Sequence, residues 1–206
     1  MLFNMEYGRK KSGGWLPTGY TEVEYIASTG SSYDNGATLY TWYAPSTNNF
    51  EIKYKMYPTA IRTSRNYFYW WSNAWLSSEY WSSSVAYNTW SSTWICKHSL
   101  SVNTLYELDI TYNNWTQTVL VNGSTYSQWY SWTVEGKWPL YFFGAWQTDA
   151  HSQERIYYIQ LYDDWELVMD LVPCTNSSNV AGMYDLVGKQ FYSSANSYVF
   201  TAWPAV

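Results

Sequence analysis

The sequence predicts an all-β protein built from antiparallel strands, and three observations lead to this fold class. Apolar and polar side chains alternate with a period of two in several segments, whereas helical periodicity is nearly absent. Asn122 and Gly123 stand between two strand-like runs, and this pair suits a type I′ turn because both central positions need positive φ. Many short strands with turn signals and no helix favour a two-sheet antiparallel sandwich.

Two segments show the alternation most clearly. In FEIKYKMY, residues 50–57, Glu51, Lys53 and Lys55 alternate with apolar and aromatic positions, and YELDITY, residues 106–112, has the same pattern. Such strands are expected to bury one face and to expose the other to solvent. The expected buried positions are Phe50, Ile52, Tyr54 and Met56 in the first segment, and Tyr106, Leu108, Ile110 and Tyr112 in the second.

Two later segments complete the predicted set of strands. PLYFFGAW, from Pro139 to Trp146, is nearly all apolar and predicts a buried strand. RIYYIQLYDDWELVMDLVPC predicts a hairpin whose turn lies near Asp163, Asp164 and Trp165. No segment after Gly14 has the composition of a linker, so we expect one domain over residues 15–206.

Composition and charge exclude several classes of partner. Aromatic residues make up 22% of the 206 residues and charged residues only 13%, which is the opposite of a disordered chain. The net charge of −5 argues against binding to nucleic acid or to an anionic membrane. No apolar run reaches the length of about 18 residues that a membrane span needs, so no membrane insertion is expected.

The first 14 residues, MLFNMEYGRKKSGG, predict a short exposed arm followed by a flexible joint. They hold three consecutive basic residues but no apolar segment after them, so no signal peptide is expected.

No cofactor or metal is expected from the titratable residues. Cys96 and Cys174 lack CxxC partners, and two buried thiols are favoured over a disulfide between them. The acidic residues at Asp34, Asp149 and Asp163-Asp164 are isolated and typical of turns, so they predict no calcium site.

Both ends of the chain resemble a known family. LPTGYTEVEYIASTGSSYDNG, from Leu16 to Gly36, and the closing segment with its hairpin, Pro-Cys and Gly-x-Tyr-Asp-x-Val motifs resemble laminin-G-like domains of phage and gut-bacterial proteins. The resemblance implies a concanavalin A-like jelly roll of the lectin and glucanase type, in which the first and last strands pair antiparallel. It implies no particular activity, because the family is defined by its fold.

A catalytic role is not expected, although glycosidases also occur on this fold. Those enzymes carry carboxylates on one strand, spaced as Glu-x-Asp-x-x-Glu or Glu-x-Asp-x-Glu. The nearest match, Glu107-x-Asp109, lacks the third carboxylate, and both residues fit the wet face of a strand. No nucleophile elbow, P-loop or dinucleotide motif is present.

The stretch from Asn66 to Trp94 is the most unusual part of the sequence. Eleven of its 29 residues are aromatic, and Ser, Asn and Thr fill most of the gaps. Aromatic rings with Ser and Asn are typical of binding surfaces, because rigid rings contact a ligand at low entropic cost. The candidate ligand-binding residues lie here, after the Asn-Gly turn, and at the later hairpin tip: Tyr69, Trp70, Trp71, Trp75, Tyr80, Trp81, Trp90, Trp129, Tyr130, Trp132 and Trp165.

Three hypotheses of function follow from these features. The first is a non-enzymatic module that binds a glycan or a host surface receptor on a phage virion, assembled in the host cytoplasm. The second is a structural virion protein, whose aromatic residues are buried against other virion proteins or in a homo-oligomer. The third is a ligand-binding protein diversified by a phage retroelement. About half of the rings in the stretch are expected to be ordinary core residues of strands.

Overall fold

The computed structural model describes residues 16–28, 36–44, 49–60, 66–70, 76–81, 84–88, 94–98, 100–113, 116–129, 140–144 and 152–205. These residues form strands and turns, and none of them is helical. The first eight strands are β1 (Tyr20–Ser28), β2 (Leu39–Tyr40), β3 (Asn49–Ala60), β4 (Asn66–Trp70), β5 (Leu76–Trp81), β6 (Ser84–Asn88), β7 (Trp94–His98) and β8 (Tyr106–Asn113). The other eight are β9 (Thr116–Val121), β10 (Ser124–Trp129), β11 (Leu140–Phe142), β12 (Gln153–Asp163), β13 (Glu166–Asn176), β14 (Ala181–Asp185), β15 (Gln190–Tyr192) and β16 (Phe200–Ala205).

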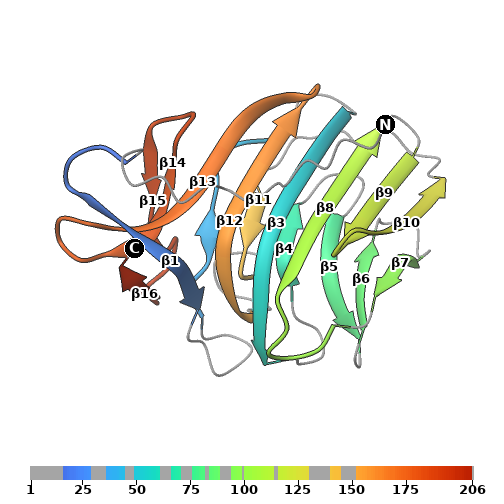
Figure 1. Ribbon diagram of the computed structural model, residues 1–206, viewed down its shortest axis with the longest axis horizontal. Helices are drawn as coiled ribbons and strands as arrows, with labels where there is room; N and C mark the ends of the chain where they lie inside the picture. Colours follow the sequence, from blue (N-terminus) through green and yellow to red (C-terminus); the bar gives the residue numbers. More distant parts are fainter. Residues whose placement is uncertain are drawn as a thin grey trace, which may run out of the picture.

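The strands form two antiparallel sheets that stack face to face, with the small sheet behind the large one in Figure 1. The large sheet has ten strands in the order β10-β9-β8-β3-β12-β1-β13-β14-β15, with β16 paired to β1. The small sheet has six strands in the order β2-β11-β4-β5-β6-β7. This arrangement confirms the all-β antiparallel sandwich predicted from the sequence.

The core lies between the sheets and follows the predicted alternation. Phe50, Ile52, Tyr54 and Met56 on β3 are fully buried, and the matching positions of β8 are at most 5% exposed. Phe50 and Tyr112 stack with ring centroids 5.0 Å apart, and Tyr54 reaches Phe142 of the small sheet at 5.8 Å. Each strand therefore presents one apolar face to the core and one polar face to solvent.

Both predicted hairpins are present. β9 and β10 are joined by Asn122 and Gly123, whose φ angles of 49° and 79° fit the type I′ turn. β12 and β13 are joined by Asp164 and Trp165, which also have positive φ, at 49° and 67°.

The aromatic stretch contains three consecutive strands of the small sheet, β4 to β6, and ends at the first residue of β7. The predicted strand from Pro139 to Trp146 is shorter than expected, because β11 ends at Phe142. The next residue, Phe143, has a φ of 66°, which an extended strand does not allow. Pro139, Ala145 and Trp146 lie outside the described residues.

The first and the last strand meet in the large sheet. β1 pairs antiparallel with β16 from Val23 to Ser28, as the resemblance implied. Cys174 on β13 is buried and forms no disulfide, and burial raises the pKa of its thiol to about 12. No helix long and apolar enough to cross a bilayer occurs in the part of the chain that the structure describes.

Candidate functional site: an aromatic cluster on the small sheet

Three aromatic side chains gather on the outer face of the small sheet, at the edge formed by β2. Leu39 and Thr41 point into the core and are fully buried, so the alternating positions Tyr40 and Trp42 point outward. Tyr141 lies outward in the same way, because Leu140 and Phe142 on either side of it are 1% exposed. We call Tyr40, Trp42 and Tyr141 the aromatic cluster.

The rings of the cluster contact one another. Tyr40 meets Trp42 edge to face with centroids 4.5 Å apart, and it meets Tyr141 at 4.7 Å. Burial raises the pKa of Tyr141, and the charge and hydrogen bond of Tyr40 add to this. The two hydroxyl groups therefore lie close together, while Trp42 remains 70% exposed. The cluster offers apolar ring surface with polar tips on its rim.

The backbone register connects this cluster to the aromatic stretch. Tyr141 pairs with Tyr40 on one side and with Tyr69 of β4 on the other. Tyr69 in turn pairs with Ser77, and Ser77 pairs with Asn88. One row across the small sheet therefore reads Tyr, Tyr, Tyr, Ser, Asn.

The β12–β13 hairpin tip touches the loop that follows the cluster. The Tyr43 hydroxyl donates a 2.5 Å hydrogen bond to the buried Asp163 carboxylate, and burial together with Asp163 raises the pKa of Tyr43. Asp164 is held by Asn49, through a 2.7 Å backbone bond and a 3.3 Å side-chain bond. The exposed residues Trp42 and Trp165 thus belong to two segments that contact each other.

Trp165 occupies a backbone conformation that favours glycine. It is 49% exposed and has a φ of 67°, in the region where a residue with a side chain costs about 1 to 2 kcal/mol. We expect Trp165→Gly to be more stable than Trp165→Ala by about 1 kcal/mol, because both variants remove the indole and only glycine relieves the strain. Urea denaturation of the two variants measures the difference. Equal stabilities would mean that the turn relaxes at no cost.

Of the eleven candidate residues predicted from the sequence, Trp165 is the one whose side chain the structure describes. Tyr69 and Trp70 lie in β4, Tyr80 and Trp81 in β5, and Trp129 ends β10, all placed by their backbone. Trp71, Trp75, Trp90, Tyr130 and Trp132 lie outside the described residues. Tyr40, Trp42 and Tyr141 were not among the candidates, because their two segments meet only in the folded sheet.

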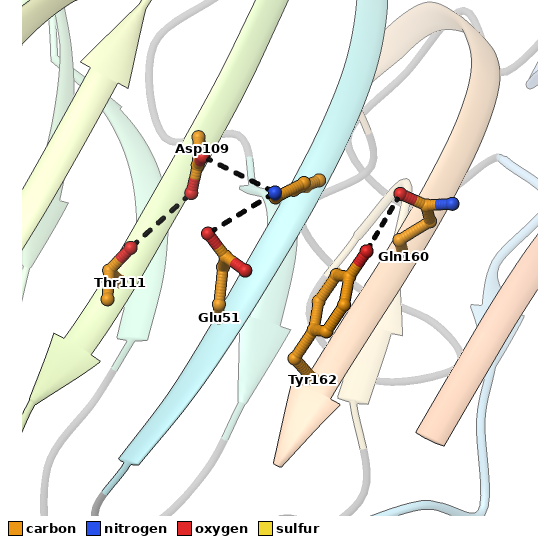
Figure 2. Close-up of polar contacts among 6 residues, drawn as sticks. Glu51, Asp109, Thr111, Gln160 and Tyr162 are labelled. Carbon is orange, nitrogen blue, oxygen red and sulfur yellow. Dashed lines mark hydrogen bonds and ion pairs between the residues drawn. The ribbon is translucent and has the colours of Figure 1, made fainter. Parts of the chain in front are cut away.

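The outer face of the large sheet is polar. Figure 2 shows its centre, where the Lys53 amine lies 3.5 Å from Glu51 and 3.9 Å from Asp109. Burial raises the pKa of Glu51 to about 7, together with a hydrogen bond to the Asp109 carboxylate and the charge of Asp109, and Lys53 opposes this rise. Thr111 donates to Asp109 two residues away on β8, and Tyr162 donates to Gln160 two residues away on β12 (Figure 2).

The carboxylates considered as catalytic or metal-binding candidates have partners within the protein. Glu107 accepts a 2.8 Å bond from Lys55, and Asp109 is bonded as described above. Among the described residues, no three His, Cys, Asp or Glu side chains gather as a metal site would require. Asp34 and Asp149 lie outside the described residues.

Comparisons with known proteins identify the fold. No family model and no curated protein matches the chain. Among solved structures, domain 4 of AbnA, a GH43 extracellular arabinanase from Geobacillus stearothermophilus in complex with arabinotriose, matches with a TM-score of 0.50 and 13% identity. That match covers 70% of this chain and 81% of the other.

Two further structures are similar. The heptameric SAP-like pentraxin from Limulus polyphemus matches with a TM-score of 0.52 and 14% identity, over 71% of this chain and 77% of that one. The galectin LEC-6 from Caenorhabditis elegans has a TM-score of 0.45 and 13% identity, over 64% of this chain and 94% of that one. At these identities the first two matches show the fold alone. The protein therefore has a concanavalin A-like jelly-roll fold.

Proposed function

We propose that this protein is a non-enzymatic binding module that holds a glycan on the outer face of its small sheet. The observation that carries the proposal is the aromatic cluster, in which a 70% exposed Trp42 is supported by Tyr40 and Tyr141. A flat ring stacks on the apolar C–H face of a sugar, while tyrosine hydroxyls bond to its hydroxyl groups. The arabinanase domain solved with arabinotriose is an example of a sugar complex on a similar fold.

The aromatic stretch extends the proposed binding surface. Its three strands β4, β5 and β6 continue the small sheet from Tyr141 through Tyr69, Ser77 and Asn88. Exposed aromatic patches of several hundred Å² are typical of ligand or partner surfaces. We therefore keep the sequence candidates of β4 and β5, from Tyr69 to Trp81, as part of the proposed site.

A glycan array with the purified protein tests the proposal. We expect Trp42→Ala to weaken binding about 30-fold, since truncating a central ring at a hot spot costs about 2 kcal/mol. Tyr141→Ala should weaken it similarly, and Tyr141→Phe less, because phenylalanine keeps the ring. Leu105→Ala is the control, since Leu105 is 42% exposed in the turn before β8 on the large sheet. Full binding by Trp42→Ala would contradict this site.

We propose that the protein is part of a phage particle, and this proposal rests on the family resemblance at the two ends of the chain. A structural role in the particle is the alternative outcome. It would be favoured if the protein occurs only in large assemblies, if no glycan on the array binds, and if Trp42 becomes protected from chemical modification on assembly. Retroelement diversification predicts that sequences from related isolates differ mainly in the aromatic stretch and agree elsewhere.

A further inference from the structure

A second aromatic group lies on the outer face of the large sheet, around Arg155 of β12. The Arg155 guanidinium lies over the Tyr25 ring at 4.7 Å and over the Tyr57 ring at 4.9 Å. Tyr25 also contacts the Tyr157 ring at 5.5 Å. We call Tyr25, Tyr57, Arg155 and Tyr157 the tyrosine clamp.

The strand register explains how four residues so distant in sequence meet. Arg155 pairs with Tyr57 of β3 on one side and with Ala27 of β1 on the other, and Tyr25 lies two residues before Ala27. A shift in the pairing of β12 with β3 falls between Ile156 and Tyr158 and leaves Tyr157 as an extra residue. Glu154 and Ile156 are fully buried, so alternation places Arg155 and Tyr157 together on the outer face, and the bulge adds an extra residue before the next buried position, Ile159.

The clamp holds a guanidinium in a fixed orientation without neutralising it. The guanidinium lies over two rings, and Arg155 opposes the rise in the pKa of Tyr157 that burial causes. Among the described residues, the ion pairs of this face join Lys53 and Lys55 to Glu51, Asp109 and Glu107, and none of them involves Arg155. Glu24 is exposed nearby and acts on Tyr157 only through its charge.

An exposed indole stands beside the clamp. Trp203 of β16 is the register partner of Tyr25 and is 68% exposed. A fixed guanidinium offers parallel donors that match a carboxylate, and the neighbouring rings offer a surface on which a sugar ring stacks. We propose that the tyrosine clamp, with Trp203, is a second binding site, specific for a sugar that carries a carboxylate group.

The experiment that tests this proposal measures binding to oligosaccharides that end in glucuronate, galacturonate or N-acetylneuraminate. The affinity for each acid is compared with the affinity for its carboxyl-methyl ester. The ester keeps the sugar ring and removes the charge. We expect the wild-type protein to bind at least one acidic form about tenfold or more tightly than its ester, because a charge-assisted bidentate bond is lost. Equal affinity for every acid and ester pair would overturn the proposal.

Three variants locate the site. Arg155→Gln should abolish the preference for the acid, and Arg155→Lys should reduce it, because an ammonium lacks the planar fork. Lys189→Gln removes a positive charge from the exposed turn between β14 and β15 and should leave the preference unchanged. If Lys189→Gln lowers the preference as much as Arg155→Gln, general charge attraction explains the binding and the clamp does not.

The same measurements separate this site from the aromatic cluster on the other sheet. Trp42→Ala should leave the preference for the acid intact, whereas Trp203→Ala should weaken binding of the acidic sugar. Loss of neutral glycan binding in Trp42→Ala alone supports the proposed function. Loss of acid preference in Arg155→Gln alone supports the clamp. Each proposal can therefore fail while the other still holds.

Discussion

Replacing Glu154 with glutamine is expected to abolish most of the loss of stability that the protein shows as pH rises from about 5 to about 9. Glu154 lies on β12 beside the clamp residue Arg155, but it points into the core and is fully buried. Ser152 donates a 2.8 Å hydrogen bond to Oε1, and among the described residues Oε2 has no partner. Burial raises the pKa of Glu154 to about 8, although the nearby hydroxyl groups of Tyr54 and Ser152 oppose the rise.

The sign of the effect follows from the two protonation states. The folded protein binds the Glu154 proton more tightly than the unfolded chain, whose glutamate has a pKa of about 4.3. Stability is therefore fully present below about pH 4, and it falls as pH rises toward the folded value of about 8. The expected loss is on the order of 3 to 5 kcal/mol, at 1.36 kcal/mol for each unit of pKa.

Urea denaturation at about pH 5, 7 and 9 measures this loss. Glu154→Gln should flatten the dependence, because the amide is close in shape and carries no proton to lose. Glu51→Gln should flatten it only slightly, since Glu51 is partly exposed and solvent screens its charge. Glu166→Gln, at the exposed start of β13, is the control and should follow the wild type. A Glu154→Gln variant with the full pH dependence would show that another group is responsible.

The sequence predicts those parts of the fold that depend on local patterns. The alternation in β3 and β8 identified the buried faces, and the positive φ values at Asn122 and Gly123 confirm the predicted turn. The hairpin tip at Asp164 and Trp165 was predicted correctly for the same reason, since turn geometry depends on neighbouring residues. The alternation of apolar and polar residues and the residue preferences of turns both act over a few neighbouring positions. A single sequence is therefore enough to reveal them.

The two candidate sites depend on register, which a single sequence does not reveal. Tyr40 and Tyr141 become neighbours only because β2 pairs with β11, about 100 residues away in the chain. Arg155 meets Tyr25 through the pairing of β12 with β1, and the bulge at Tyr157 alters the alternation that sequence reasoning relies on. By contrast, the exposure of Trp165 follows from the hairpin tip itself, which a local sequence pattern predicts.

Gly182→Ala is expected to destabilise the protein by about 3 kcal/mol or more, because the site has no room for a methyl group. A Cβ atom at Gly182 would lie 2.3 Å from the Tyr192 carbonyl oxygen and 2.7 Å from the Phe191 ring. The carbonyl belongs to β15, which pairs directly with β14 from Met183 to Asp185. Backbone moves less readily than a side chain, so the two strands would have to separate.

Gly182 begins the Gly-x-Tyr-Asp-x-Val motif on which part of the family resemblance rests, and each of its main residues has a structural role. Tyr184 packs against Tyr20 of β1 with ring centroids 4.8 Å apart. The buried Asp185 accepts backbone hydrogen bonds from Asp170 at 2.9 Å and from Val187 at 3.0 Å. The motif therefore fixes β13, β14 and β15 to the start of β1. It marks the fold and carries no information about the ligand.

A double variant separates the two contacts that oppose the methyl group. Phe191→Leu replaces the ring that meets the Cβ atom with a shorter side chain but leaves the Tyr192 carbonyl in place. The double variant Gly182→Ala/Phe191→Leu should therefore recover only part of the stability that Gly182→Ala loses. Urea denaturation of both single variants and the double variant measures the coupling between them. A loss below about 1 kcal/mol in Gly182→Ala would mean that β14 and β15 move apart easily. Any glycan binding that survives in these variants would confirm that the motif lies outside the binding surfaces.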